Sequence, residues 1–227
     1  MPFAWSLVAV AATVVLGLAV GRGSTAFDAA IAGRLGGPSP LVDALTLLTH
    51  PALMVFAMGL IAALTARTRP LLAVLAVAGP ILAVSLNTWV LKPGFDRVYD
   101  DHLAYPSGHT TTLAAVLTVA VIAWPRVLAV AVPLVLVAGA AIVAAGYHYA
   151  TDIVGATLWG PAAVTFLWGR SREPRPQRQY LEKRRSVAGS PGPVAQSSEG
   201  TTVRRYGHGG VRCVTWRRGD QRRRGRR

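Results

Sequence analysis

The stretch VLAVAVPLVLVAGAAIVAAG, residues 127–146, contains no charged side chain, and this feature decides the predicted fold. A helix of about 20 apolar residues can cross the ~30 Å hydrocarbon layer of a bilayer. Strand-like alternation is absent, so the predicted fold class is an all-α, polytopic membrane bundle. Together with five similar stretches it gives six predicted transmembrane helices, at residues 3–20, 41–66, 71–91, 107–124, 127–146 and 152–169.

The composition agrees with a membrane protein, because 52% of the 227 residues are hydrophobic and 15% are charged. The net charge of +14 is concentrated near the C-terminus. Residues 1–169 contain 7 of the 24 basic and 6 of the 10 acidic residues, which leaves 17 basic and 4 acidic residues for the rest. We therefore predict a membrane domain, residues 1–170, followed by a disordered basic tail, residues 171–227.

Three interpretations of this tail remain open. It attaches to anionic lipids of the inner leaflet, it binds RNA, which is the weaker option, or it has no selected function, since it resembles an out-of-frame translation of GC-rich DNA. Nucleic acid is thus not an expected partner. The one cysteine, Cys213, lies in the tail, which excludes an intrachain disulfide and a cysteine-based metal site.

The distribution of basic residues predicts the orientation, because short cytoplasmic loops carry an excess of Lys and Arg. We predict a multi-pass protein of the cell membrane with its N-terminus and its tail in the cytoplasm. The connection 21–40 then lies outside, where residues 27–32 form either a short interfacial helix or a plain loop. The inner side has Arg67, Arg69, Arg126 and the tail, and the outer side has Arg22, Arg34, Lys92 and Arg97.

Two polar segments, residues 91–110 and 146–152, lie on the same outer side, because two helices separate them. Pro106-Ser107-Gly108 precedes an apolar helix, whose first backbone N–H groups are free to bind an anion. Lys92 and Arg97 add cationic donors that suit phosphate oxygens. The segments therefore predict a phosphate site at the extracytoplasmic face.

The same segments contain an acid and a base. His109 can donate a proton to a leaving oxygen. His148 and Asp152 are four residues apart, so the carboxylate can hold one ring nitrogen and leave the other free. Each residue alone has a simpler explanation, such as helix capping by Asp152 or snorkelling by Lys92. Their convergence on one side of the membrane favours a catalytic site.

Three motifs, Lys92 to Arg97, Pro106-Ser107-Gly108-His109 and His148-x-x-x-Asp152, resemble the signature motifs of the type 2 phosphatidic acid phosphatase superfamily, the lipid phosphate phosphatases. The resemblance implies a six-helix bundle that hydrolyses a lipid-linked phosphate monoester or pyrophosphate through a phosphohistidine, without metal or other cofactor. It implies His148 as the nucleophile, Asp152 as its orienting carboxylate and His109 as the general acid. The implied phosphate cradle is Lys92, Arg97, Ser107 and Gly108.

Two positions depart from the family's pattern. Tyr99 stands where the first motif has an arginine, seven residues after the lysine, and Ile142 stands where the third motif has one, six residues before the histidine. The loss of one charged donor costs on the order of 10²–10³ in rate. An alternative is therefore a weak or inactive member that binds or transports a lipid phosphate. Phosphatidic acid, phosphatidylglycerol phosphate and polyprenyl pyrophosphate all stay open as substrates, and so does the oligomeric state.

A rival interpretation places Mg²⁺ or Ca²⁺ in the loop at residues 96–102, which contains three aspartates and His102. A solvated loop between apolar helices attracts such residues in any case, so we expect no metal site. His50, beside Pro51 within the predicted span 41–66, is expected to be a packed, neutral residue.

Overall fold

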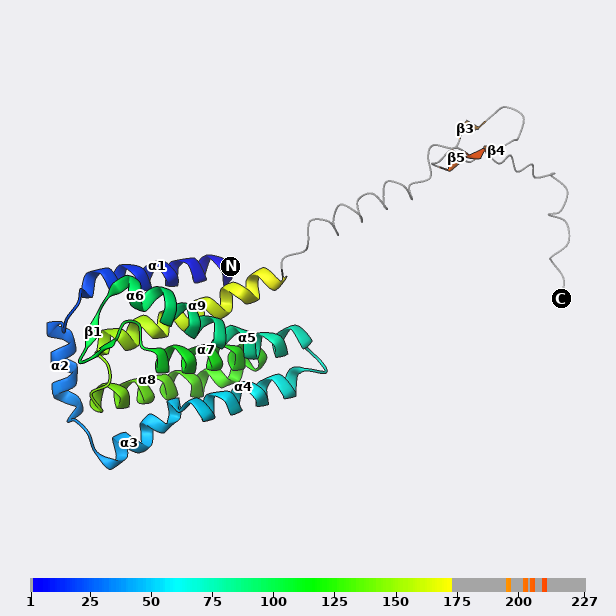
Figure 1. Cartoon of the computed structure of the whole chain (residues 1–227). Helices are drawn as coiled ribbons and strands as arrows, with labels where there is room; N and C mark the ends of the chain where they lie inside the picture. The colour runs from blue at the N-terminus through cyan, green and yellow to red at the C-terminus, as the bar shows by residue number, and fades with distance from the viewer. Residues whose placement is uncertain (1, 173–194, 197–201, 204, 207–209, 212–227) are drawn as a thin grey trace. The chain divides into compact units, whose positions relative to one another are not determined.

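The computed structural model describes residues 2–172 and four short strands farther along the chain (Figure 1). The chain divides into two compact units, Met1–Arg172 and Glu173–Arg227. In the second unit, β3 (Ala195–Gln196) pairs antiparallel with β4 (Thr202–Val203), and β5 (Arg205–Tyr206) pairs antiparallel with β6 (Gly210–Val211). The predicted disorder of the tail concerns residues that lie for the most part outside the described ones.

All six stretches predicted to span the membrane are helical in the first unit. The helices are α1 (Pro2–Val20), α3 (Pro40–Thr46) with η1 (Leu47–Thr49) and α4 (Pro51–Thr65), α5 (Pro70–Leu86) with η2 (Asn87–Leu91) and α6 (Lys92–Phe95), α7 (Gly108–Ala123), η3 (Pro125–Val127) with α8 (Leu128–Ala144), and α9 (Ala150–Arg172). Three of the described helices are long and apolar enough to cross a membrane by themselves, namely Pro70–Phe95, Pro125–Ala144 and Ala150–Ser171. The bent pair α3–η1 and α4 provides a fourth, and Ala4–Val20 and Gly108–Ala123 are apolar but shorter.

The predicted span 41–66 is not one straight helix. It is bent by 40° between Thr49 and Pro51. His50 has an extended backbone, as the residue before a proline prefers, and its Nδ1 accepts a hydrogen bond from the backbone N–H of Ala52. The prediction of a packed His50 is wrong, because its side chain lies at this break and is exposed.

The connection 21–40 contains a helix, α2 (Ala26–Leu35), so the helical alternative for this segment is confirmed. Thr25 and Asp28 form a capping box at its start, and Gly36 ends it with a φ of 81°, a conformation that glycine adopts without strain. In Figure 1, α2 lies across the end of the bundle where α1 ends and α9 begins. Its position brings the first turn of α2 close to the polar segments of the predicted site.

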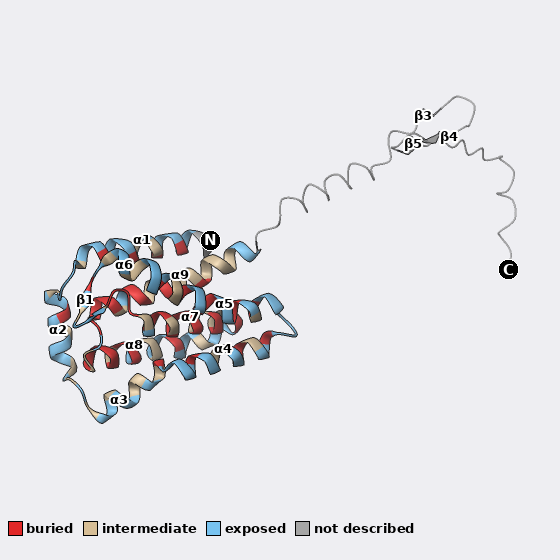
Figure 2. Ribbon diagram, in the orientation of Figure 1, coloured by how far each residue is buried: buried red, intermediate tan, exposed pale blue. Residues whose placement is uncertain are grey.

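Buried residues lie between the helices and exposed residues cover their outer faces (Figure 2). The buried core is mainly aliphatic, and many of the exposed side chains are large and apolar as well. Leu72, Leu113 and Val164 are fully or almost fully buried among α5, α7 and α9. Leu18 and Leu136, in contrast, are 71% and 66% exposed on the outside of α1 and α8. A soluble monomer rarely exposes large apolar faces, whereas a membrane bundle presents them to lipid.

Two glycines let an aromatic side chain connect α1 and α9. The Tyr105 ring is so close to both helices that a Cβ at Gly17 or Gly155 would lie 2.5–2.6 Å from its atoms. The Tyr105 hydroxyl donates a hydrogen bond of 2.6 Å to the carbonyl of Thr13. This contact fixes the chain directly before Pro106, and so helps to position the motif that follows.

Candidate functional site

A cavity of about 620 Å³ lies where α4 and α7 begin and α8 ends. Its lining combines residues of the three motifs with an apolar wall. The motif residues are Lys92, Gly108, His109 and His148, and the remaining lining residues are Thr46, Leu47, Thr49, His50, Pro51, Met54, Val84, His102, Thr112, Ile142 and Tyr147. A mixed lining of this kind fits a ligand with a polar head and an apolar body.

The Pro106–His109 motif forms the turn into α7. Ser107 is the N-cap of this helix, and its Oγ accepts a hydrogen bond from the Thr110 N–H. Asn87, in the π-helical turn η2, donates hydrogen bonds from Nδ2 to the Pro106 carbonyl and to Thr111 Oγ1. These contacts hold the helix start in place, and Gly108 leaves open space where another residue would have a Cβ.

Lys92 reaches the same cavity from α6. Its ammonium group donates a hydrogen bond of 2.6 Å to the Leu103 carbonyl. Leu103 belongs to β2 (His102–Leu103), which pairs antiparallel with β1 (Val98–Tyr99). The hairpin therefore both anchors Lys92 and places His102 at the mouth of the cavity. Among the lining residues that the structure describes, Lys92 is the one lysine or arginine.

His148 lies in the short turn between α8 and α9, with its side chain 5% exposed. Its Nδ1 is 3.5 Å from Oδ2 of Asp152, and the same oxygen accepts a hydrogen bond of 3.0 Å from the Tyr149 N–H. Asp152 therefore caps the start of α9 and also faces the histidine, so both of its predicted roles are structurally compatible. Since Nδ1 is turned toward Asp152, Nε2 is the ring nitrogen left for a substrate.

The electrostatics favour a neutral His148. Burial lowers the pKa of His148 below its ordinary value, and the nearby Asp152 carboxylate opposes this effect only in part. Lys92 and His102 act in the same direction as burial. A neutral imidazole has a free lone pair on one nitrogen, which nucleophilic attack requires.

Three histidine rings gather at the cavity. The ring centroid of His148 is 6.5 Å from that of His109 and 5.6 Å from that of His102. His109 was predicted to be at the site, whereas His102 was considered only as a metal ligand. Nε2 of His102 lies 3.2 Å from the Tyr147 carbonyl. Within the described residues, no group of three His, Cys, Asp or Glu side chains is arranged to hold a metal ion.

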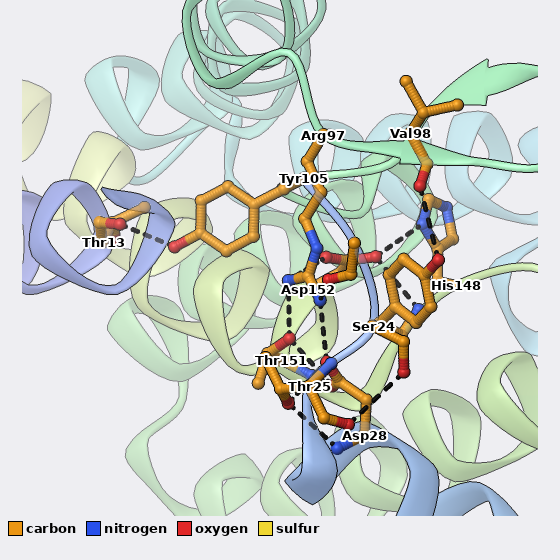
Figure 3. A network of polar contacts seen from close by, with 12 residues as sticks. Thr13, Ser24, Thr25, Asp28, Arg97, Val98, Tyr105, His148, Thr151 and Asp152 are labelled. Carbon is orange, nitrogen blue, oxygen red and sulfur yellow. Dashed lines mark hydrogen bonds and ion pairs between the residues drawn. The ribbon is translucent and has the colours of Figure 1, made fainter. Parts of the chain in front are cut away.

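Arg97 differs from its predicted position in the phosphate cradle. Its side chain is fully buried, lies behind Asp152 and does not line the cavity. Nη1 is 3.1 Å from Oδ1 of Asp152, and Nη2 is 2.7 Å from Oδ2 of Asp28 (Figure 3). Two buried carboxylates flank the guanidinium, so its charge is compensated within the protein and is directed away from the space where a phosphate would bind.

Sequence reasoning does not identify two further residues, one behind the site and one in the lining of the cavity. Asp28 is a buried partner of Arg97 and gives no local motif signal, because its contacts come from residues far away in the chain. His50 lines the cavity, and the proline that follows it did signal a helix break at this position. Ile142, which stands at the position of the family's third-motif arginine, also lines the cavity.

Comparison with known proteins identifies the family of the chain. A search of the curated proteins gave no match. A similar solved structure is that of "the first transmembrane PAP2 type phosphatidylglycerolphosphate phosphatase from Bacillus subtilis", with a TM-score of 0.60 and 21% sequence identity over 75% of this chain and 98% of that chain. The sequence model of the PAP2 superfamily matches residues 43–176, which is more than half of the chain. The predicted family is thereby confirmed, and the chain belongs to the PAP2 superfamily, which includes membrane phosphatases.

Proposed function

We propose that this protein is an integral membrane phosphatase that hydrolyses a lipid-linked phosphate monoester or pyrophosphate through a phosphohistidine at His148, without a metal. The observation that carries the proposal is the position of His148. Its ring lies at a cavity that also contains His109, Lys92 and the start of α7, and Asp152 lies behind it. Family membership supports a phosphatase, and the apolar part of the cavity supports a lipid substrate.

In the first proposed step, Nε2 of His148 attacks the phosphorus and forms a P–N bond. The P–O bond to the lipid breaks, and the leaving oxygen takes the bonding electron pair and a proton from His109. Asp152 stabilises the positive charge that develops on the imidazole. Lys92 and the N–H groups at the start of α7 balance the charge on the phosphoryl oxygens.

In the second step, water replaces the histidine. His109, now neutral, removes a proton from the water, whose oxygen bonds to phosphorus while the P–N bond breaks. The products are inorganic phosphate and a free His148, and His109 again carries its proton. The reaction consumes one water for each phosphate and requires no cofactor.

We further propose the arrangement in the membrane. Six helical segments cross the bilayer, residues 1–170 form the phosphatase domain, and residues 171–227 form a basic tail on the cytoplasmic side. Arg69 Nη1 donates a hydrogen bond to the Ala123 carbonyl, so the α4–α5 and α7–α8 connections lie together. These connections carry Arg67, Arg69 and Arg126 at the end opposite the cavity, which supports an extracytoplasmic site. In this arrangement the tail has anionic inner-leaflet lipids as its partner.

One observation favours a second function. Neither Tyr99 nor Ile142 supplies the arginine that the family motifs have, and Arg97 faces away from the cavity. A site with Lys92 as its one permanent cation among the described lining residues can bind a phosphate and still turn it over slowly. The alternative is therefore a protein that binds or transports a lipid phosphate.

Phosphate release from purified protein separates the two functions. The full chain in detergent is incubated with phosphatidic acid, phosphatidylglycerol phosphate and a polyprenyl pyrophosphate, with EDTA present and with His148→Ala in parallel. We expect release that survives EDTA and is absent in the variant. Binding of these lipids by folded protein without any release would support the alternative and contradict the phosphatase.

A further inference from the structure

Asp28 is a buried acidic residue that the proposed mechanism does not use. It lies in the first turn of α2, ahead of residues 43–176 that match the family, and its side chain is 1% exposed. A buried carboxylate is costly unless it is paired and hydrogen-bonded. Its position next to the catalytic centre therefore requires an explanation.

Both oxygens of this carboxylate have partners. Oδ1 accepts hydrogen bonds of 2.8 Å from the backbone N–H and from the hydroxyl of Thr151. Oδ2 accepts from the backbone N–H and the hydroxyl of Thr25, at 2.9 and 2.8 Å, and from Arg97 Nη2 at 2.7 Å. Burial raises the pKa of Asp28, but the hydrogen bonds from Thr151 and Thr25 outweigh it and hold the pKa below its ordinary value. Asp28 is therefore ionised.

Arg97 extends this network to the catalytic centre. Its Nη2 also donates to the Gly23 carbonyl, at 3.0 Å, and its Nη1 donates to the Thr151 hydroxyl, at 2.7 Å. The guanidinium carbon lies 4.5 Å from the centroid of the Tyr149 ring. Contacts on so many sides leave the guanidinium one position, in which Nη1 is 3.1 Å from Oδ1 of Asp152 (Figure 3).

The two oxygens of Asp152 thus have separate tasks. Oδ1 is next to Arg97, whereas Oδ2 is next to the Tyr149 N–H and His148 Nδ1. Asp28 supports this orientation twice, through the guanidinium and through the backbone of Thr151, the residue directly before Asp152. With a neutral side chain at position 28, Arg97 keeps Asp152 as its one carboxylate partner, and Asp152 can turn away from His148.

We propose that Asp28 is a positioning residue of the catalytic centre, which acts through Arg97 and Thr151 to hold the Asp152 carboxylate against His148. Helix α2, outside the part of the chain that matches the family, is then a component of the active site. The inference rests on the proposed function, because it assigns the network to the nucleophile of that reaction. Outer residues that orient metal-binding side chains typically contribute about 10–100-fold to activity, and we expect an effect of the same size for a residue that orients Asp152.

The test uses Asp28→Asn, Arg97→Gln and the double variant in the full chain, purified in detergent. Asp43→Asn is the matched control, because Asp43 is an exposed aspartate in the first turn of α3 and does not line the cavity. For Asp28→Asn we expect a 10–100-fold lower kcat at a nearly unchanged KM. For Asp43→Asn we expect wild-type values.

The double variant separates positioning from stability. Removal of one partner of a buried ion pair destabilises a protein strongly, whereas removal of both is often tolerated. We therefore expect the double variant to regain the thermal stability that each single variant loses, while its kcat stays low. Recovery of kcat together with stability would overturn the proposal, and so would a folded Asp28→Asn protein with the wild-type kcat.

A readout without turnover keeps this result independent of the proposed function. Diethyl pyrocarbonate modifies neutral histidine, and mass spectrometry measures its rate at His148. We expect slower modification of His148 in Asp28→Asn and in the double variant than in Asp43→Asn, because a carboxylate held at Nδ1 makes the other ring nitrogen more basic. Absence of phosphate release by the wild type contradicts the proposed phosphatase, whereas an equal rate of His148 modification in all these proteins overturns the positioning role.

Discussion

Oδ2 of Asp152 lies 3.5 Å from Nδ1 of His148 and only 3.0 Å from the Tyr149 backbone nitrogen. The hydrogen bond with the start of α9 therefore fixes the Asp152 carboxylate. From this position the carboxylate faces His148. Catalytic hydrogen bonds are often long without substrate and shorten when it binds. The relationship connects the fold to the proposed chemistry, because a common helix-capping contact also orients the proposed nucleophile.

The proposed role of His109 as general acid predicts a dependence on the leaving group. In His109→Ala, hydrolysis of a lipid phosphate with an alkyl leaving group should fall by about 10²–10⁴, because the alkoxide leaves without a proton. Hydrolysis of a nitrophenyl phosphate ester should fall much less, since nitrophenolate needs no proton to leave. The comparison uses kcat/KM for both substrates, because kcat/KM reports the formation of the phosphohistidine and not its later hydrolysis, in which His109 acts as a base. An equal loss with both would argue against proton donation by His109.

The pH dependence of kcat/KM should report His148 in its neutral form. Because burial lowers the pKa of His148, the acid limb of the profile should lie below the ordinary histidine value of 6.5. The Asp152 carboxylate raises this pKa, so Asp152→Asn should move the acid limb to lower pH and also reduce the rate. Lys92 lowers the pKa, so Lys92→Met should move the limb to higher pH. Movement of both variants in the same direction would contradict the electrostatic assignment.

The contact of Tyr105 with α9 predicts a stability effect. A Cβ at Gly155 would lie 2.5 Å from the Tyr105 ring, which is fully buried. Gly155→Ala should therefore reduce the free energy of unfolding by about 1–3 kcal/mol. Gly59→Ala is the control, because a Cβ there meets no atom within 4 Å. Unfolding curves in detergent measure the stability of both variants. Equal stabilities would show that the α1–α9 contact adjusts to the added methyl group without a loss of stability.

The proposed orientation predicts the accessibility of Cys213, the one cysteine of the chain. In intact cells, a membrane-impermeant maleimide should leave Cys213 unlabelled, and permeabilised cells should show labelling. A Cys213→Ser variant that also carries Asp43→Cys should be labelled before permeabilisation, because residue 43 lies on the same side of the membrane as the cavity in the proposed orientation. Labelling of Cys213 in intact cells would place the tail outside and the proposed active site in the cytoplasm.

The helices themselves are readily predicted from sequence, because long apolar stretches such as 127–146 allow few other structures. The Pro106–His109 and His148–Asp152 motifs were also found, since their chemistry is local in the sequence. Arg97 was predicted to contact phosphate, and its true partners could not be foreseen. These partners are Asp28, which lies 69 residues before Arg97, and Asp152, which lies in α9. Only the packing of α2 against the start of α9 brings them together.

The break at His50 had a signal in the following proline, yet the apolar character of residues 41–66 dominated the prediction. Hydrophobicity identifies a stretch as a membrane segment but does not reveal a bend within it. The position of His50 at the cavity depends on this 40° bend. Composition therefore does not identify site residues that lie at irregular points of helices.

Trapping of the covalent intermediate tests the central claim most directly. Protein mixed with a ³²P-labelled lipid phosphate is quenched in alkali within milliseconds, and the labelled residue is identified by mass spectrometry. The account predicts a phosphoryl group on His148 that is stable in alkali and labile in acid, and that is absent in His148→Ala. Rapid phosphate release without any label on His148, or undiminished release by the His148→Ala variant, would contradict it.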